Sequence, residues 1–190
     1  MADGSSGDVF IGQSYRFDDK NNPFTTGSGL DQQSSDLVGK VSLDYKNAYK
    51  VDYRFQMDNE DLSSQRHEFD GSLSFANVTL GSQYLYAKGL EDTDVSETRE
   101  QVRNYVSYKI DDQWRVMASA RHDLGIDKGL RQAAAGLDYS GQCISATLSA
   151  SRNLTDEASG DSGTEVFLRI GLKNLGEFET SGLSFNNSNE

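Results

Sequence analysis

The chain has 190 residues, of which 35% are hydrophobic, and its formal net charge is −12. This charge argues against a general affinity for nucleic acid, and no apolar run approaches the ~18 residues that a transmembrane helix needs. Residues 1–7 lack the basic and apolar stretches of an export signal, so we expect a flexible amino-terminal tail on a piece of a longer protein.

About ten segments have the length and the alternation of β-strands. The clearest is 49–58, in which every second residue is apolar and the others are charged or polar. About 9–11 residues are enough for a tilted strand to cross the hydrocarbon core of a bilayer. The predicted strands are 8–17, 36–45, 49–58, 66–75, 78–87, 99–110, 114–123, 130–139, 143–152 and 164–173.

Short and long connections alternate between these strands. Residues 46–48, 76–77, 111–113 and 140–142 form short turns, whereas the other connections are long and polar. Segregation of loops by length is typical of outer-membrane barrels. The sequence therefore predicts an all-β, antiparallel up-and-down meander that is part of a transmembrane outer-membrane β-barrel.

Charged side chains gather on one face of the predicted strands, and the other face is almost free of charge. This is the segregation that lipid contact demands, because Arg or Lys at mid-bilayer depth costs ~2–4 kcal/mol. Two strands fit less well: 99–110 places Asn104 outward and Tyr105 inward, and 143–152 has mostly small residues. The predicted lumen-facing basic residues are Lys40, Arg54, Arg103, Arg115, Arg121, Arg131, Arg169 and Lys173.

Aromatic residues flank the short turns on the predicted lipid-facing side. Such rings are typical of an interfacial girdle at headgroup level, here at the periplasmic rim. Aromatic residues that cap the core of a soluble sandwich are the alternative. The predicted girdle consists of Tyr45, Tyr49, Phe75, Tyr108, Trp114 and Tyr139.

No catalytic constellation emerges, so we expect neither an enzyme nor a cofactor. His67 and His122 have no metal-spaced companion and are predicted to be strand-end surface residues. Carboxylates at 59–61, 91–94 and 156–157 have the chemistry to hold Ca²⁺ or Mg²⁺, but hydrated loop charge is the preferred interpretation.

Six stretches carry a family resemblance through their order and spacing: 12–17, 27–31, 35–39, 52–55, 136–139 and 167–176. Together they resemble the carboxy-terminal β-barrel portion of the lipopolysaccharide-assembly protein LptD family, also called organic solvent tolerance proteins, of the alphaproteobacterial type. The resemblance covers residues 8–176 and leaves a polar carboxy-terminal tail over 177–190. It implies part of a translocon in the outer membrane of a Gram-negative bacterium.

The resemblance also implies partners: lipopolysaccharide, an LptE-like plug lipoprotein, outer-membrane lipid, and the remaining barrel and periplasmic domain of a parent protein. Cys143 matches a family position that bridges to the periplasmic domain, although a small buried residue in a strand is the alternative. The last strand would form one edge of a lateral seam. Its residues are Val166, Phe167, Leu168, Arg169, Ile170, Gly171, Leu172 and Lys173.

Two other functions remain open from the residues. A self-contained porin-like channel would share the alternating faces and the mixed charges of the lumen. A soluble β-barrel or sandwich that binds a small ligand would instead turn its apolar rows inward, against a second layer of the same molecule. The direction of the apolar rows therefore discriminates between these functions.

Overall fold

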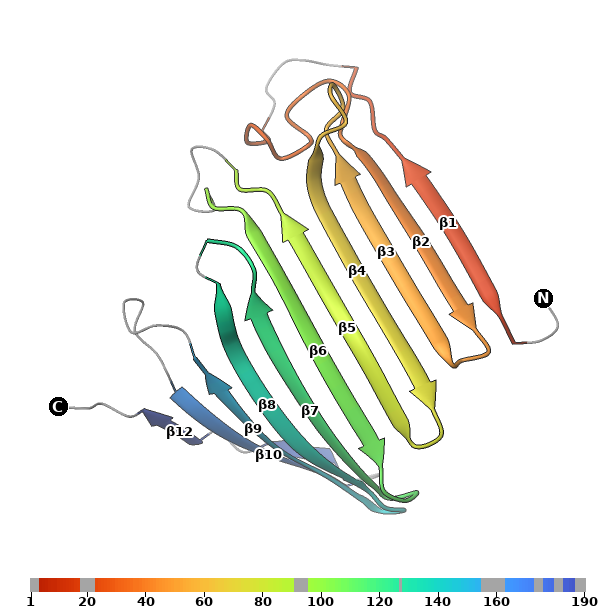
Figure 1. The fold of residues 1–190 in the computed structure, drawn as a ribbon, viewed down its shortest axis with the longest axis vertical. Helices are drawn as coiled ribbons and strands as arrows, with labels where there is room; N and C mark the ends of the chain where they lie inside the picture. The colour runs from red at the N-terminus through yellow and green to blue at the C-terminus, as the bar shows by residue number, and fades with distance from the viewer. Residues whose placement is uncertain are drawn as a thin grey trace. The chain divides into compact units, whose positions relative to one another are not determined.

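The predicted strands are present as antiparallel β-strands (Figure 1). The structure is a computed structural model that describes residues 4–17, 23–90, 96–126, 128–154 and 163–172, with the backbone of 176–179 and 183–186. No helix among these residues is long and apolar enough to cross a membrane. The strands are β1 (Ser6–Gly12), β2 (Leu37–Tyr45), β3 (Tyr49–Met57), β4 (Ser64–Phe75), β5 (Val78–Ala87), β6 (Arg99–Lys109), β7 (Trp114–Asp123), β8 (Gly129–Ser140), β9 (Ile144–Asn153), β10 (Gly163–Leu172), β11 (Gly176–Glu179) and β12 (Leu183–Asn186).

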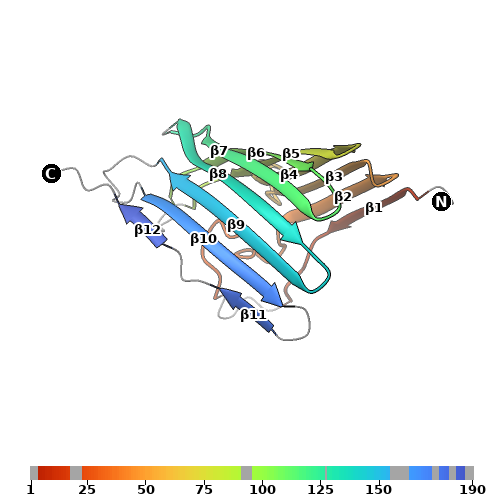
Figure 2. The ribbon, with the colours of Figure 1, turned by 90° about the horizontal axis from the view of Figure 1, so that it is seen from below.

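The strands follow one another in the sheet in the order of the chain, from β1 to β11. This order confirms the up-and-down meander. Strands β11 and β12 lie where the sequence predicts a polar tail, and both pair with β10 (Figure 2). The chain divides into two compact units, residues 1–73, 82–102 and 124–127, and residues 74–81, 103–123 and 128–190.

The first strand is shorter than the alternation predicts. Strand β1 ends at Gly12, and residues 13–17, expected to continue it, leave the ladder. The reason is competition from the following loop: Ser14 N donates to Ser35 Oγ at 2.8 Å, and Gln13 Nε2 donates to the Ser35 carbonyl at 2.9 Å. Only an isolated bridge between Tyr15 and Ser34 remains of the described pairing here.

In the first unit, the register of β2, β3 and β4 places apolar side chains on one face of the sheet and charged side chains on the other. Val41 lies opposite Tyr53, which lies opposite Phe69, so this row is apolar. The adjacent row, on the other face, runs from Lys40 through Arg54 to a carboxylate at residue 68. Alternation along each strand is thus converted into two continuous faces.

The second unit repeats this arrangement in β7 to β10. Val116, Leu137, Leu148 and Leu168 form one row across the four strands. The neighbouring row on the opposite face contains Arg115, Asp138, Thr147 and Arg169. Charged and apolar rows therefore alternate here as well.

Backbone geometry explains the tight turn between β2 and β3. Lys46 and Asn47 both have positive φ, at 53° and 54°, and Ala48 N donates to the Tyr45 carbonyl at 3.0 Å. Positive φ at both central residues of a β-turn matches the twist of the flanking strands. Asp44 Oδ1 supports this turn by accepting from Asn47 N at 3.0 Å.

Tyr105, the inward aromatic residue that fitted the alternation poorly, covers a glycine. Its ring lies where a β-carbon on Gly81 would stand, so the ring replaces the missing side chain. Both residues belong to the second unit. The exception to the alternation is therefore a packing feature of this unit.

None of the apolar side chains in the described ranges is buried. Leu43 on β2 is 54% exposed, and Leu148 on β9 is 47% exposed. A soluble sandwich would have buried these rows against a second layer. The apolar rows thus have the exposure expected of a surface that lipid covers.

Candidate functional site

The polar face of the first unit carries a dense set of ion pairs. Lys40 Nζ lies 3.7 Å from Asp52 Oδ1, and Lys50 Nζ lies 3.1 Å from Asp44 Oδ2. These pairs connect β2 and β3, whose opposing residues share this face. Because both lysine side chains are more than 40% exposed, each pair contributes only ~0.2–1 kcal/mol to stability.

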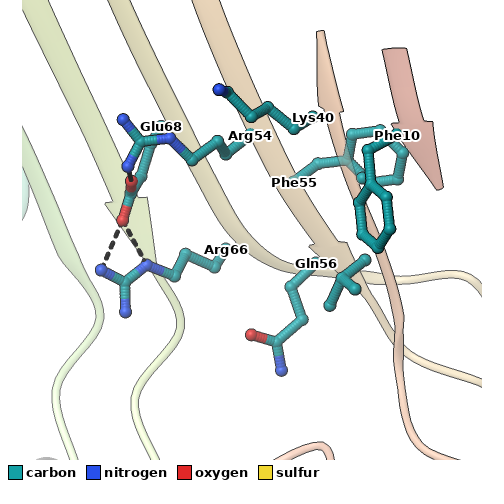
Figure 3. Close-up of a pocket in the computed structure, with 9 residues that line it drawn as sticks. Phe10, Lys40, Arg54, Phe55, Gln56, Arg66 and Glu68 are labelled. Carbon is teal, nitrogen blue, oxygen red and sulfur yellow. Dashed lines mark hydrogen bonds and ion pairs between the residues drawn. The ribbon is translucent and has the colours of Figure 1, made fainter. Parts of the chain in front are cut away.

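One carboxylate on this face holds two guanidinium groups. Arg54 Nη1 donates to Glu68 Oε2 at 2.9 Å, and Arg66 Nε donates to Glu68 Oε1 at 2.6 Å (Figure 3). Both arginine side chains remain more than half exposed, at 56% and 55%. Each guanidinium has five N–H donors, so both retain donors for an additional anion.

Next to these arginines the polar face is hollowed into a recess of about 380 Å³. Phe10 of β1 and Val38 of β2 form its apolar side, and Lys40 with the two arginines forms its cationic side. Figure 3 shows Phe10 on the opposite side of the recess from Glu68. The basic recess, as we call it, has the chemistry to hold an anion attached to a less polar body.

A second recess, of about 450 Å³, lies under the loop between β1 and β2 and shares Phe10, Val38 and Gln56 with the first. A side chain of β3 holds this loop in place, because Gln56 Nε2 donates to Asp36 Oδ2 at 2.8 Å. Gly29, with φ of 77°, lies so close to these two side chains that a β-carbon there would overlap them.

This loop is also connected to the loop between β3 and β4. Gln13 Nε2 donates to Asn59 Oδ1 at 2.8 Å, and Asn59 Nδ2 donates to Gln32 Oε1 at 3.4 Å. Ser35 and Asp36 are among the few buried side chains of the described residues, and both are polar. Hydrogen bonding therefore orders this end of the first unit without an apolar core.

Two loop carboxylates outside the predicted spanning strands have lowered pKa values. Hydrogen bonds from the Ser63 hydroxyl and backbone N–H hold the pKa of Asp61 below its usual value of 3.8. The Lys109 ammonium, at 2.8 Å, lowers the pKa of Asp112 in the same way. No group of metal-binding side chains occurs in the part of the chain that the structure describes, and residues 91–94 and 156–157 lie outside it.

The predicted basic residues divide between the two units. Lys40 and Arg54 line the basic recess together, whereas Arg115 and Arg169 stand in the polar row of β7 to β10. Lys173 lies outside the described residues. Arg103, Arg121 and Arg131 lie on β6, β7 and β8 and line neither of the two recesses described above.

Sequence reasoning missed Arg66, which completes the basic recess. Arg66 is the first residue of the predicted strand 66–75, whereas β4 begins two residues earlier, at Ser64. Arg66 is two residues from Glu68 and four from Asp70, so alternation along the strand places all three on the charged face. This spacing was the signal in the sequence that could have identified Arg66.

The predicted girdle residues all flank short turns. Tyr45 and Tyr49 have ring centroids 6.2 Å apart across the first turn, and Trp114 and Tyr139 have centroids 4.8 Å apart. Phe75, next to the turn between β4 and β5, is 79% exposed, and Tyr108 lies near the end of β6.

Cys143 lies just before β9, and most of the predicted seam strand lies on β10. Cys143 is an exposed free thiol in the turn before β9, not the buried strand residue of the alternative. The predicted seam residues up to Leu172 form most of β10, which pairs with β9 on one edge and with β11 and β12 on the other.

Comparison with known proteins agrees with this architecture. The family model of LptD, described as LPS transport system D, matches residues 2–114. The LPS-assembly protein LptD of Azoarcus sp. (strain BH72) is 28% identical over 176 residues, which are 91% of this chain and 21% of that protein. The chain thus spans about a fifth of the length of this curated relative. With a family model that covers more than half of its residues, the chain belongs to the LptD family.

Proposed function

We propose that this chain acts in lipopolysaccharide transport and assembly at the outer membrane, as the carboxy-terminal barrel part of an LptD-like translocon. The observation that carries the proposal is the separation of faces, with exposed apolar rows on one side and charged rows on the other. Lipid would cover the apolar rows, and water, sugar and phosphate would contact the charged rows. The function is structural and needs no catalytic group.

The basic recess is the part of the charged face best suited to contact an anionic substrate. Its three cations, Lys40, Arg54 and Arg66, outnumber the single carboxylate of Glu68 that lines it. Arginine binds phosphate oxygens through a planar pair of donors, and lysine adds a point charge. In our proposal, phosphate groups of lipopolysaccharide pass this recess during transport.

The test uses the complete protein that contains this chain, in proteoliposomes with fluorescent lipopolysaccharide. We expect the triple variant Lys40→Gln, Arg54→Gln, Arg66→Gln to slow transfer about tenfold, the equivalent of about one charge-assisted hydrogen bond. The control replaces Lys46, in the turn between β2 and β3, and Lys109, the last residue of β6, with Gln and should transfer at the normal rate. Equal rates in both variants would reject the recess as a transport contact.

The same preparations distinguish the porin-like alternative. A self-contained channel conducts ions when this chain alone is placed in a bilayer, and its conductance does not depend on a parent protein. The translocon proposal expects transfer only from the complete protein and no stable open conductance from this chain. Stable conductance of the chain alone favours the channel.

Cys143 is proposed to form a disulfide with the periplasmic domain of the parent protein. Its exposure in a short turn supports this proposal, because a partner thiol has access to it. In the complete protein we expect a shift between reducing and non-reducing gels that Cys143→Ser abolishes. An unchanged shift in Cys143→Ser would assign the bridge to other cysteines.

Two further contacts are proposed for the assembled translocon. Strand β10, with β11 and β12 along its outer edge, would lie at the lateral seam, and an LptE-like plug lipoprotein would contact the charged face.

The aromatic residues beside the short turns would form a girdle at the periplasmic rim. Crosslinks from a photoreactive residue at Arg115 to the plug lipoprotein, with none from Val116, would test the plug contact.

A further inference from the structure

The outer edge of β10 is paired with the carboxy-terminal segment of the same chain. Strand β11 lies opposite residues 169–172 and β12 lies opposite residues 163–166, both antiparallel to β10 (Figure 2). All three strands belong to the second unit. The edge of a sheet presents N–H and C=O groups that attract another strand, so β11 and β12 occupy groups that would otherwise be open to a partner.

The two short strands follow different registers on β10. Glu179 of β11 lies opposite Arg169. In β12, Leu183 lies opposite Val166. From the first pair to the second, the chain advances four positions on one side, from 179 to 183, and three on the other, from 169 to 166. An offset of one residue interrupts the ladder, as a β-bulge does.

This offset matches a change of parity in the sequence. The apolar residues of β11 and β12 are Phe178, at an even number, and Leu183 and Phe185, at odd numbers. If β12 continued the register of β11, its apolar residues would lie opposite the charged-face positions of β10. With the offset, all three lie opposite positions on the same side of β10 as Leu168 of the apolar row: Ile170, Val166 and Thr164.

The positions of β11 and β12 opposite the charged side of β10 are polar. Glu179 lies opposite Arg169, a cross-strand pair of opposite charge. The other positions on this side are Glu177, Ser184 and Asn186. Residue type and register therefore agree on both faces, which indicates that the sequence of the two short strands is adapted to this edge.

The pairing on this edge is short compared with the pairing on the other edge of β10. Strand β9 pairs with β10 without interruption from Thr164 to Leu172, whereas β11 and β12 have four residues each. Among the described strands, β11 and β12 pair with β10 alone. Short strands at the edge of a sheet open at a lower free energy than strands held on both sides. We therefore expect β11 and β12 to leave the sheet before β9 or β10 does.

We propose that β11 and β12 form a displaceable edge strand, which shields β10 and gives way to a partner strand. The partner would be an antiparallel strand of the remaining barrel, with the same alternation of apolar and polar residues but without the offset. An uninterrupted strand makes more backbone hydrogen bonds to β10 than two short pieces, so it would replace them. The identity of this partner rests on the lateral seam proposed above, whereas the shielding of the edge does not depend on transport.

Paired cysteines test the register of the edge strand. In a Cys143→Ser background, Thr164→Cys with Phe185→Cys should form an intramolecular disulfide on mild oxidation, because the two residues are directly opposed. The control combines Thr164→Cys with Ser184→Cys, the residue that would lie opposite Thr164 if β12 continued the register of β11. Mass spectrometry measures the bridged fraction. Equal or greater bridging in the control would overturn the offset and the fit of the segment to β10.

A fluorescent peptide with the sequence of residues 176–186 tests the displacement, by anisotropy in detergent micelles. A chain that ends at residue 175 should bind it about tenfold more tightly than the full chain, as expected when the edge is open in about a tenth of the full chains. A chain that ends at residue 186 is the matched control and should bind as the full chain does. The oxidised double-cysteine variant should not bind the peptide through β10. The edge of β1 is common to all four proteins, so differences between them report on β10.

The outcomes decide each part of the proposal. Equal affinities of the truncated and full chains would overturn the shielding. Tight binding by the truncated chain with none by the full chain would show a permanent strand and overturn the displacement. Failure of the transfer assay described above, with these affinities as expected, would reject the proposed function alone.

A second variant keeps the test decisive if circular dichroism shows that the truncated chain does not fold. Proline at two adjacent positions of each short strand, Glu177→Pro with Phe178→Pro and Ser184→Pro with Phe185→Pro, keeps the length of the chain. Adjacent N–H groups of a strand point to opposite sides, so each pair of prolines removes a donor toward β10. This variant should bind the peptide as tightly as expected for the truncated chain, and the affinity of the unaltered full chain would overturn the proposal.

Discussion

The ring of Phe55 lies across Gly39 of the neighbouring strand, in the space where a side chain at residue 39 would stand. The two residues are directly opposed in the pairing of β2 and β3. Glycine in a strand costs stability, and an aromatic ring that covers it recovers part of this cost. The ring also keeps the apolar row continuous where Gly39 has no side chain.

The first prediction concerns this pair. A β-carbon at residue 39 would overlap the Phe55 ring, so Gly39→Ala should destabilise the folded chain by ~1–3 kcal/mol, as overpacking does. Denaturant titration of the chain folded in detergent micelles measures this loss. The double variant Gly39→Ala, Phe55→Leu should regain part of it. Additive losses in the double variant would show that the ring and the glycine are not coupled.

The second prediction tests the lipid-facing assignment. Val41 is the central residue of β2 and belongs to the apolar row, and Ser42, the next residue, lies on the charged face. Arginine at mid-bilayer depth on the lipid side costs ~2–4 kcal/mol, so Val41→Arg should impair refolding into bilayers far more than Ser42→Arg. The fraction that refolds into vesicles is the measurement. Equal tolerance of the two arginines would contradict the assignment.

The third prediction concerns Glu68, the single carboxylate between two guanidinium groups. Glu68→Gln removes both ion pairs, but because Arg54 and Arg66 are more than half exposed, the loss of stability should not exceed ~1 kcal/mol. Arg54 and Arg66, left without their shared counter-charge, should together with Lys40 bind inorganic phosphate more tightly, a change that titration calorimetry detects. Asp112→Asn, in an exposed turn, is the control and should leave phosphate binding unchanged.

The fourth prediction is a pH dependence in the loop between β3 and β4. Because the pKa of Asp61 is lowered in the folded chain, its ionised form stabilises the loop above pH ~3.8, and this contribution is lost as the pH falls through the lower folded value. Carbon-13 NMR of the carboxyl group should give a midpoint below 3.8. Ser63→Ala should move the midpoint back toward that value. An identical midpoint in both proteins would reject the role of Ser63.

Period-two alternation was enough to predict most strands and their faces, because side-chain direction in a strand depends only on parity. The first strand is the exception: Val9, Phe10 and Ile11 are all apolar, so the segment has no clear parity, and the hydrogen bonds that end it come from Ser35, more than 20 residues away. The same alternation places Lys40 and Arg54 on the charged face, where both line the basic recess.

The contacts of His67 could not be predicted in the same way. The imidazole of His67 on β4 contacts Tyr53 on β3 and Tyr86 on β5. These contacts depend on the register between strands, which the sequence of each strand alone does not contain. An isolated histidine near the end of a strand is usually a surface residue, so the prediction for His67 followed from frequency rather than from its partners. The contact between Tyr53 Oη and the imidazole is visible only once β3 and β4 are paired.

Asn59 is bonded to both arms of the loop between β1 and β2, through Gln13 and Gln32, although it belongs to the loop between β3 and β4. The two loops are therefore not independent segments, and a local opening of one must release hydrogen bonds of the other. Amide protons in both loops would then exchange with solvent as one cooperative group, with a common free energy of opening. A ligand that entered the recess beneath the first loop would, by the same connection, slow exchange in the second.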